Sequence, residues 1–190
     1  MTNGFKYLAH ILAKGVKGVF EPVTYWYQEI GAHVGHLVTL IEKDRENNIL
    51  LVQQACRPGL LSKNAQVVEW SCKFFAKLAL EFTNKQMMPL AWEWFISEHG
   101  GMQGCLLGLK RHPQLAESII SVLVQYARYD MVELFTIHLK NVCPEPTEQI
   151  QMMIALFKPL TESNFTKDEV TKFEIVLSHH LIIDCVFRSY

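Results

Sequence analysis

Hydrophobic residues recur every three or four positions along most of this chain, which is the spacing of one face of an α-helix. No segment alternates with the period of two that marks a half-buried β-strand for long enough to suggest a sheet. We therefore predict an all-α protein with about nine to eleven helices of ordinary length. The pattern places the first helices near residues 4–19, 23–44, 48–56 and 65–82.

Turn and capping residues mark where several helices begin and end. Asn64 precedes a periodic apolar segment and can cap its N-terminus, and Thr147 can do the same after the break Cys-Pro-Glu-Pro. Pro89 opens another segment, because proline fits the first turn of a helix. We expect this segment to stop at Gly100–Gly101, where glycine can adopt the left-handed conformation that closes a helix.

Two long segments share one order of polar and apolar residues. Residues 66–80 (QVVEWSCKFFAKLAL) align with residues 114–128 (QLAESIISVLVQYAR), 48 positions further on. This offset lies near the period of roughly 40–47 residues found in some stacked helical repeats. We therefore expect the two helices to be adjacent and nearly parallel. A weaker third copy, residues 169–182, follows at a longer spacing.

Each aligned segment carries one narrow polar stripe. In the first copy the stripe consists of Gln66, Glu69, Lys73, Lys77 and Glu81, and in the second of Glu117, Ser121, Gln125 and Arg128. A helix packed by both neighbours in a stack leaves only such a thin strip exposed, so the pattern predicts stacked inner helices. On the other faces we expect burial of Val67, Cys72, Phe75, Leu115, Ile119, Leu123 and Tyr126.

The string ISEHGGMQGCLLGLKRHPQLAESIISVLVQYA, residues 96–127, resembles an armadillo repeat, in which two short helices precede a long inner one. The resemblance implies an armadillo-like right-handed superhelix, an α-solenoid of about three to four helical repeats. It also implies that residues 1–190 form a single domain. The expected units are an irregular one at 1–46, then 47–82, 83–129 and 130–190.

Armadillo proteins are mostly scaffolds that bind extended peptides along a groove lined by the third helices. The resemblance therefore implies a non-catalytic protein–protein interaction scaffold. In peptide-binding members the third helix carries a tryptophan and, four residues later, an asparagine, and this ladder is missing here. The matching positions in the first two copies are Lys73, Lys77, Ser121 and Gln125, and in the weak third copy Val176 and His180. The candidate protein-binding residues are Lys73, Lys77, Ser121, Gln125 and His180.

The two lysines at these positions change the expected partner. They would repel a basic peptide, so we expect a protein segment that is acidic or of mixed charge. The alternative is that Glu69–Lys73 and Lys77–Glu81 are ordinary ion pairs one turn apart on an exposed helix face.

Composition narrows the class of protein. Charged residues make up 19% and hydrophobic residues 49%, which fits helices buried on more than one face, and the net charge of −1 gives no footprint for nucleic acid. Five scattered cysteines indicate a reducing, intracellular environment, cytoplasmic or nuclear.

No apolar run reaches the roughly 20 residues of a transmembrane helix. The N-terminal segment is amphipathic, with Lys6, Lys14 and Lys17, so contact with a membrane surface is the alternative to a first helix of the array.

We predict no enzymatic activity, no cofactor and no metal, because no acid, base and nucleophile converge in the sequence. His33 and His36 lie one helical turn apart, but no third metal ligand is near them. Trp92 and Trp94 must face different ways on one helix. One of them is expected in the core, and the other either packs against a neighbouring repeat or anchors a partner.

A second function remains open, that of a structural subunit or a fragment of a larger assembly or solenoid that flanks an enzyme domain. The final residues, LIIDCVFRSY, are apolar, whereas the outer face of a terminal repeat is normally polar. In this alternative the contacts run through the apolar ends, near Phe5 and near Val186 and Phe187, and give an oligomer or a larger complex.

Overall fold

The computed structural model describes residues 34–127 and 132–162, together with residues 165–168, 170–171, 173–175 and 178. All elements within these ranges are helices, which confirms the prediction of an all-α protein. They are α3 (Val34–Ile41), α4 (Arg45–Leu60), α5 (Ala65–Asn84), α6 (Met88–Ile96), α7 (Gly101–Arg111), the 3₁₀ turn η1 (Pro113–Leu115), α8 (Ala116–Tyr126), α9 (Val132–Val142) and α10 (Pro146–Glu162).

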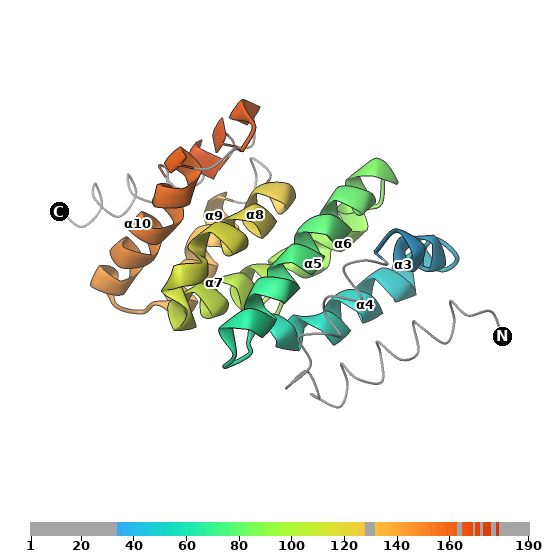
Figure 1. Cartoon of the computed structure of the whole chain (residues 1–190), viewed down its shortest axis with the longest axis horizontal. Coiled ribbons are helices and arrows are strands. Elements are labelled where there is room, and N and C mark those ends of the chain that lie inside the picture. The colour runs from blue at the N-terminus through green and yellow to red at the C-terminus, as the bar shows by residue number, and fades with distance from the viewer. Residues whose placement is uncertain are drawn as a thin grey trace.

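Six of the described helices lie in two layers (Figure 1). In one layer α5, α8 and α10 stand side by side, with α5 packed on α8 and α8 on α10. In the other layer α4 packs on α7 and α7 on α9, and contacts of α4 with α5 and of α7 with α8 join the two layers. The two aligned segments are therefore adjacent as predicted, and Figure 1 shows α5 and α8 running in the same general direction.

The third place in the first layer belongs to α10, because α10 is the helix that packs on the other side of α8. Much of the weak third copy at 169–182 lies outside the described residues. Its Phe173 is buried, and the Phe173 ring meets the Phe135 ring of α9 edge to face at a centroid distance of 5.8 Å. The short CPEP connection leads from α9 directly back to the first layer, where α10 packs on α8.

The core is aromatic where the layers meet. The Phe95 and Tyr126 rings stack at a centroid distance of 3.9 Å, and the Phe75 and Trp94 rings stack at 5.9 Å. Trp94 is therefore the core tryptophan of the pair, and Trp92 is half-buried against the same core. Six of the seven residues that the sequence predicts to be buried expose 1% or less of their surface: Val67, Cys72, Phe75, Ile119, Leu123 and Tyr126. The seventh, Leu115 in η1, is half-buried.

A buried polar contact links three helices inside this core. The Gln53 amide of α4 donates to the carbonyl oxygen of Ala91 in α6 at 3.3 Å and to the Tyr126 hydroxyl of α8 at 3.4 Å. Burial raises the pKa of Tyr126, so its hydroxyl stays protonated at neutral pH. The node links α4, α6 and α8, because breaking both hydrogen bonds would leave the buried amide NH₂ group of Gln53 unpaired.

The glycines before α7 do not have the expected role. α6 ends at Ile96, and Gly100 is the residue before α7, with an extended backbone (φ −87°, ψ −165°) rather than a left-handed one. A Cβ on Gly100 would overlap the carbonyl oxygen of Trp94, and a Cβ on Gly101 would lie 2.5 Å from the Phe95 ring. The prediction of a left-handed closure is wrong, since close packing is what requires glycine here.

The predicted helix ends are right in one case and wrong in another. The Asn64 side chain accepts a hydrogen bond of 2.9 Å from the backbone N–H of Gln66, so Asn64 caps α5 as predicted. Thr147 does not cap α10, because that helix already begins at Pro146, whose fixed φ suits a first helical position. α4 extends beyond the predicted 48–56 at both ends and includes Pro58.

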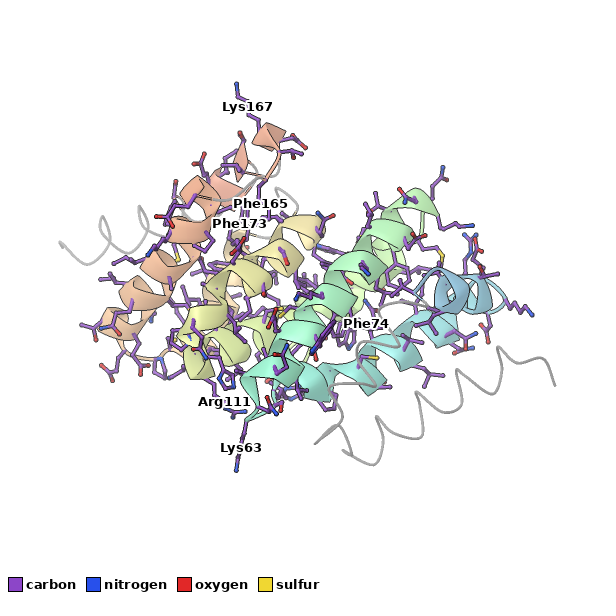
Figure 2. The ribbon with its side chains drawn as sticks, viewed as in Figure 1. Lys63, Phe74, Arg111, Phe165, Lys167 and Phe173 are labelled. Atoms are coloured by element: carbon purple, nitrogen blue, oxygen red, sulfur yellow. The ribbon has the colours of Figure 1, made fainter. Side chains whose placement is uncertain are left out.

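The link between α4 and α5 is fastened to the end of α7. The Arg111 guanidinium donates to the carbonyl oxygen of Leu61, and Nε2 of the buried His112 lies 3.0 Å from the carbonyl oxygen of Ser62. Figure 2 shows Arg111 at the same end of the molecule as Lys63 of this link. These bonds fix the place where the chain turns from α7 into η1 and α8.

Candidate protein-binding groove

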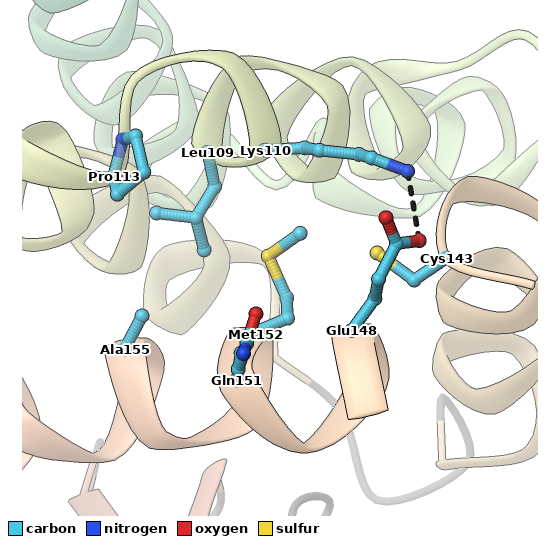
Figure 3. Close-up of a pocket in the computed structure, with 8 residues that line it drawn as sticks. All are labelled: Leu109, Lys110, Pro113, Cys143, Glu148, Gln151, Met152 and Ala155. Atoms are coloured by element: carbon cyan, nitrogen blue, oxygen red, sulfur yellow. Dashed lines mark hydrogen bonds and ion pairs between the residues drawn. The ribbon is translucent and has the colours of Figure 1, made fainter. Parts of the chain in front are cut away.

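A groove runs between α10 and the chain from the end of α7 to the start of α8. It consists of two adjoining depressions of about 340 and 530 Å³, which share Pro113 and Ala155. The first depression, drawn in Figure 3, is also lined by Leu109, Lys110, Cys143, Glu148, Gln151 and Met152. The second is also lined by Gln114, Ala116, Glu117, Lys158, Pro159 and Glu162.

One face of α10 forms a whole wall of this groove. The wall residues follow each other at steps of one or three, which keeps them on a single helix face: Glu148, Gln151, Met152, Ala155, Lys158, Pro159 and Glu162. At a rise of 1.5 Å per residue, the wall is about 21 Å long. Met152 and Pro159 are buried and line the floor, whereas Gln151, Lys158 and Glu162 are exposed at the rim.

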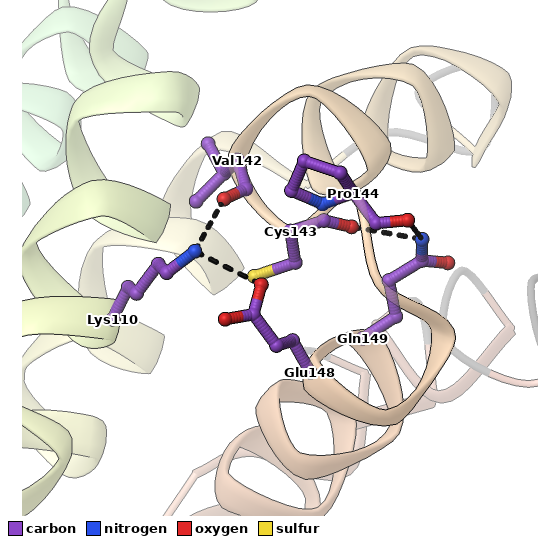
Figure 4. Close-up of polar contacts among 6 residues, drawn as sticks. All are labelled: Lys110, Val142, Cys143, Pro144, Glu148 and Gln149. Carbon is purple, nitrogen blue, oxygen red and sulfur yellow. Dashed lines mark hydrogen bonds and ion pairs between the residues drawn. The ribbon is translucent and has the colours of Figure 1, made fainter.

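A lysine clasp closes one end of the groove (Figures 3 and 4). Lys110 Nζ lies 3.0 Å from Glu148 Oε2 and donates to the carbonyl oxygen of Val142, also at 3.0 Å. The hydrogen bond with Glu148 raises the pKa of Lys110, which therefore keeps its charge. Val142 is the last residue of α9, where the helix dipole favours a positive charge. The clasp thus joins α7, α9 and α10.

The turn beside the clasp is held by a buried glutamine. The Gln149 amide donates to the carbonyl oxygen of Cys143 at 2.8 Å, so the first turn of α10 is bound to the preceding connection (Figure 4). The Cys143 side chain lines the groove, and burial raises the pKa of its thiol while the nearby Lys110 lowers it. The net shift is upward, so this thiol is protonated at neutral pH.

Charges of both signs line the groove, and apolar side chains separate them. Lys110 and Lys158 are the basic lining residues, and Glu117, Glu148 and Glu162 are the acidic ones. The apolar part comes from Leu109, Pro113, Ala116, Met152, Ala155 and Pro159. An apolar floor between charged rims suits a protein segment better than a small anion or a purely lipid-like molecule.

The structure places four of the five predicted site residues on the neighbouring helices α5 and α8. Lys73 and Lys77 are exposed on α5, and Ser121 and Gln125 are half-buried on α8. His180 lies outside the described residues. None of the four described residues lines the α10 groove, so the structure offers two separate candidate surfaces.

Lys73 and Ser121 already make local contacts. Lys73 Nζ is 2.5 Å from Glu69 Oε1 and 5.1 Å from the centroid of the Trp70 ring, so the predicted ion pair one turn apart is present. The Ser121 hydroxyl donates to the carbonyl oxygen of Ser118 at 2.6 Å. A partner at this surface would have to compete with these contacts, and binding there stays a prediction.

The α10 groove does not show in the sequence, because it depends on contacts between residues that are far apart along the chain. Lys110 and Glu148 are 38 positions apart, and no periodicity within one helix connects them. A usable signal was present in α10 itself, where Gln151, Ala155 and Pro159 put small or polar residues on a face that a buried helix would fill with larger apolar ones.

Metal binding finds no geometric support in the part of the chain that is described, where no group of three or more His, Cys, Asp or Glu side chains could hold an ion. His33 and the side chain of His36 lie outside that part.

Among the described cysteines, burial raises the pKa of the Cys105 thiol to about 12 and also raises those of Cys56, Cys72 and Cys143. No helix in the same ranges is both long enough and apolar enough to cross a bilayer.

Fold and groove together define an all-helical, two-layered protein with an elongated groove of mixed charge. Comparison with protein-family models, with curated proteins and with solved structures gave no match. The functional proposals below therefore rest on the residues and on the geometry of this chain.

Proposed function

We propose that this protein is a non-catalytic protein–protein interaction scaffold that binds a partner segment of mixed charge in the α10 groove. The observation that carries the proposal is the continuous groove wall of about 21 Å, with its apolar floor and its charged rims. A groove of this length takes about six residues of an extended segment. Grooves that combine an apolar floor with a polar rim are typical of protein recognition.

The proposed architecture is an armadillo-like right-handed superhelix. The order α5, α8, α10 in one layer and α4, α7, α9 in the other supports it, because a stack of helical repeats gives two such layers. In this arrangement the groove lies between successive members of the first layer. If the stack continued, each further pair of helices in the first layer could form an equivalent groove.

Recognition would depend on apolar anchors and on charge order. Side chains of the partner segment would fill the space above Met152 and Ala155, where they lose contact with water. A basic residue of the partner would face Glu162, and an acidic one would face Lys158, so that charge fixes the direction of the segment. The pairing of Lys110 with Glu148 keeps that end of the groove shaped before the partner arrives.

A photo-cross-linking amino acid at Gln151, on the rim, tests the proposal. Cross-linked peptides identified by mass spectrometry should come from one partner segment with charges of both signs, and the same group at Glu133 on α9 should not give them. The synthetic peptide should then bind wild-type protein at least about tenfold more tightly than Ala155→Trp, because the indole fills the groove.

Two further variants separate this site from the others. Ile154 is next to Ala155 in sequence, but it is 63% exposed and does not line the groove. The Ile154→Trp variant should therefore bind the peptide normally. Lys73→Glu with Lys77→Glu should also leave binding unchanged. Loss of binding in that double variant, with normal binding by Ala155→Trp, would refute the groove and favour the surface predicted from the sequence.

A structural subunit of a larger assembly is the second candidate, and exposed apolar residues favour it. Leu50, Leu51 and Leu90 of α4 and α6 expose 38–43% of their surface, and Ile137 and Ile150 of α9 and α10 expose 47% and 51%. Such side chains at opposite sides of an array suit end-to-end packing. Sedimentation at several concentrations tests this, since self-association that Ile150→Asp abolishes would support assembly.

A further inference from the structure

A second surface depression has a different chemistry from the α10 groove. It lies between α4 and α6 and has a volume of about 620 Å³. Trp94 contributes an apolar wall, and Leu50 and Leu90 at its sides are 42% and 38% exposed. Its charged lining residues are Glu46 and Glu93, and within the described ranges no lysine or arginine lines it. We call this depression the α4–α6 cleft; it is apolar and negatively charged.

We propose that the α4–α6 cleft is the docking site for residues 5–19 of the same chain. This segment has apolar residues at helical spacing from Phe5 to Val19, and it carries Lys6, Lys14 and Lys17 with no Asp or Glu. As a helix it would present an apolar stripe to the exposed leucines and lysines to the two glutamates of the cleft. Charge favours this site, because the described lining of the cleft has two glutamates and no basic residue, whereas the α10 groove has lysines beside its glutamates.

The lengths of residues 5–19 and 20–33, and the place where the described structure starts, allow this contact. A helix of residues 5–19 would be about 22 Å long. Residues 20–33 follow it and can span up to about 46 Å when extended. The described structure starts at Val34 in α3, which packs against α4, the helix that forms one side of the cleft. The tether therefore holds the segment at a high effective concentration near its site.

Hydrogen exchange of the full chain, read by mass spectrometry, tests the proposal. A lone amphipathic helix of this length is marginal in water, so slow exchange of residues 5–19 requires docking. Exchange should become between about twofold and thirtyfold faster in Glu46→Lys with Glu93→Lys, which removes two ion pairs. Adding Lys14→Glu and Lys17→Glu to that variant should restore slow exchange. Glu133→Lys with Glu145→Lys has the same charge change at two exposed residues outside both the cleft and the groove, and should behave as wild type.

Several results would overturn the proposal. Equal exchange of residues 5–19 in the wild type and in Glu46→Lys with Glu93→Lys would remove the cleft as their site. Protection that disappears on dilution would assign the cleft to a second copy of the chain. Protection that appears only with anionic vesicles would place the segment on a membrane surface instead. None of these results bears on binding in the α10 groove, which uses other residues.

Discussion

Alanine at two glycines should change stability in opposite directions, because the two positions differ in the space around them. A Cβ on Gly108 of α7 would lie 2.9 Å from the carbonyl oxygen of Leu60 and 3.5 Å from a methyl group of Val68. A Cβ on Gly35 of α3 would meet nothing within 4 Å. The Leu60 oxygen belongs to the backbone at the end of α4, so only a shift of α7 against α4 could relieve the contact.

The sizes of the two effects follow from these distances. Alanine in place of glycine gains about 1 kcal/mol inside a helix, and overpacking a core costs about 1–3 kcal/mol. Because the Leu60 oxygen cannot rotate away, we expect Gly108→Ala to lose about 1–2 kcal/mol in the free energy of unfolding. Gly35→Ala should gain about 0.5–1 kcal/mol. Gly104→Ala should lie between them, because its Cβ would be 3.1 Å from a methyl group of Leu60, which can move.

Urea unfolding followed by circular dichroism measures all three variants. A difference of about 2 kcal/mol between Gly108→Ala and Gly35→Ala corresponds to about 4–8 °C in Tm for a chain of this size. The m value should stay constant, so that the midpoint reports stability alone. Equal stabilisation by both substitutions would refute the close approach of α7 to α4, and with it the position of the α7 wall of the groove.

Two further predictions concern the core. Leu123 is fully buried in α8, so Leu123→Ala should cost about 2–5 kcal/mol in urea titration, and a loss below about 0.5 kcal/mol would mean that α8 is misplaced. Burial raises the pKa of the Cys105 thiol from its ordinary value of 9.0 to about 12, so this thiol ionises first in the unfolded chain. Stability should therefore fall between these pH values, by at most about 1.4 kcal/mol per pH unit from this group. A wild-type slope no steeper than that of Cys105→Ala would contradict the burial of the thiol.

Local chemistry was enough to predict the helices and much of the core. The cap at Asn64 and the burial of Phe75 and Leu123 follow from side-chain spacing within one helix, which the sequence displays directly. The role of Gly100 could not be predicted in this way. It depends on how close α6 and α7 approach each other, and a left-handed turn and a tight contact both select glycine.

The binding surfaces were harder to predict than the fold. Lys73 and Lys77 stand out in the sequence because they belong to one stripe on one helix. The α10 groove requires Lys110 to meet Glu148 and Pro113 to face Ala155, and these pairs exist only after α10 has taken its place beside α8. Helix-by-helix periodicity carries no information about such a register between helices.

The order of the helices within the layers also bears on how the chain folds during its synthesis. α5 pairs with α8 and α8 with α10, so each newly synthesised helix finds its neighbour among those already completed. Proteins dominated by such near-neighbour contacts fold by extension from a nucleus, and during translation their N-terminal part folds first. α10 is the last of these three helices to leave the ribosome, and it supplies a complete wall of the groove. A nascent chain can thus pack α4 to α8 before α10 completes the groove.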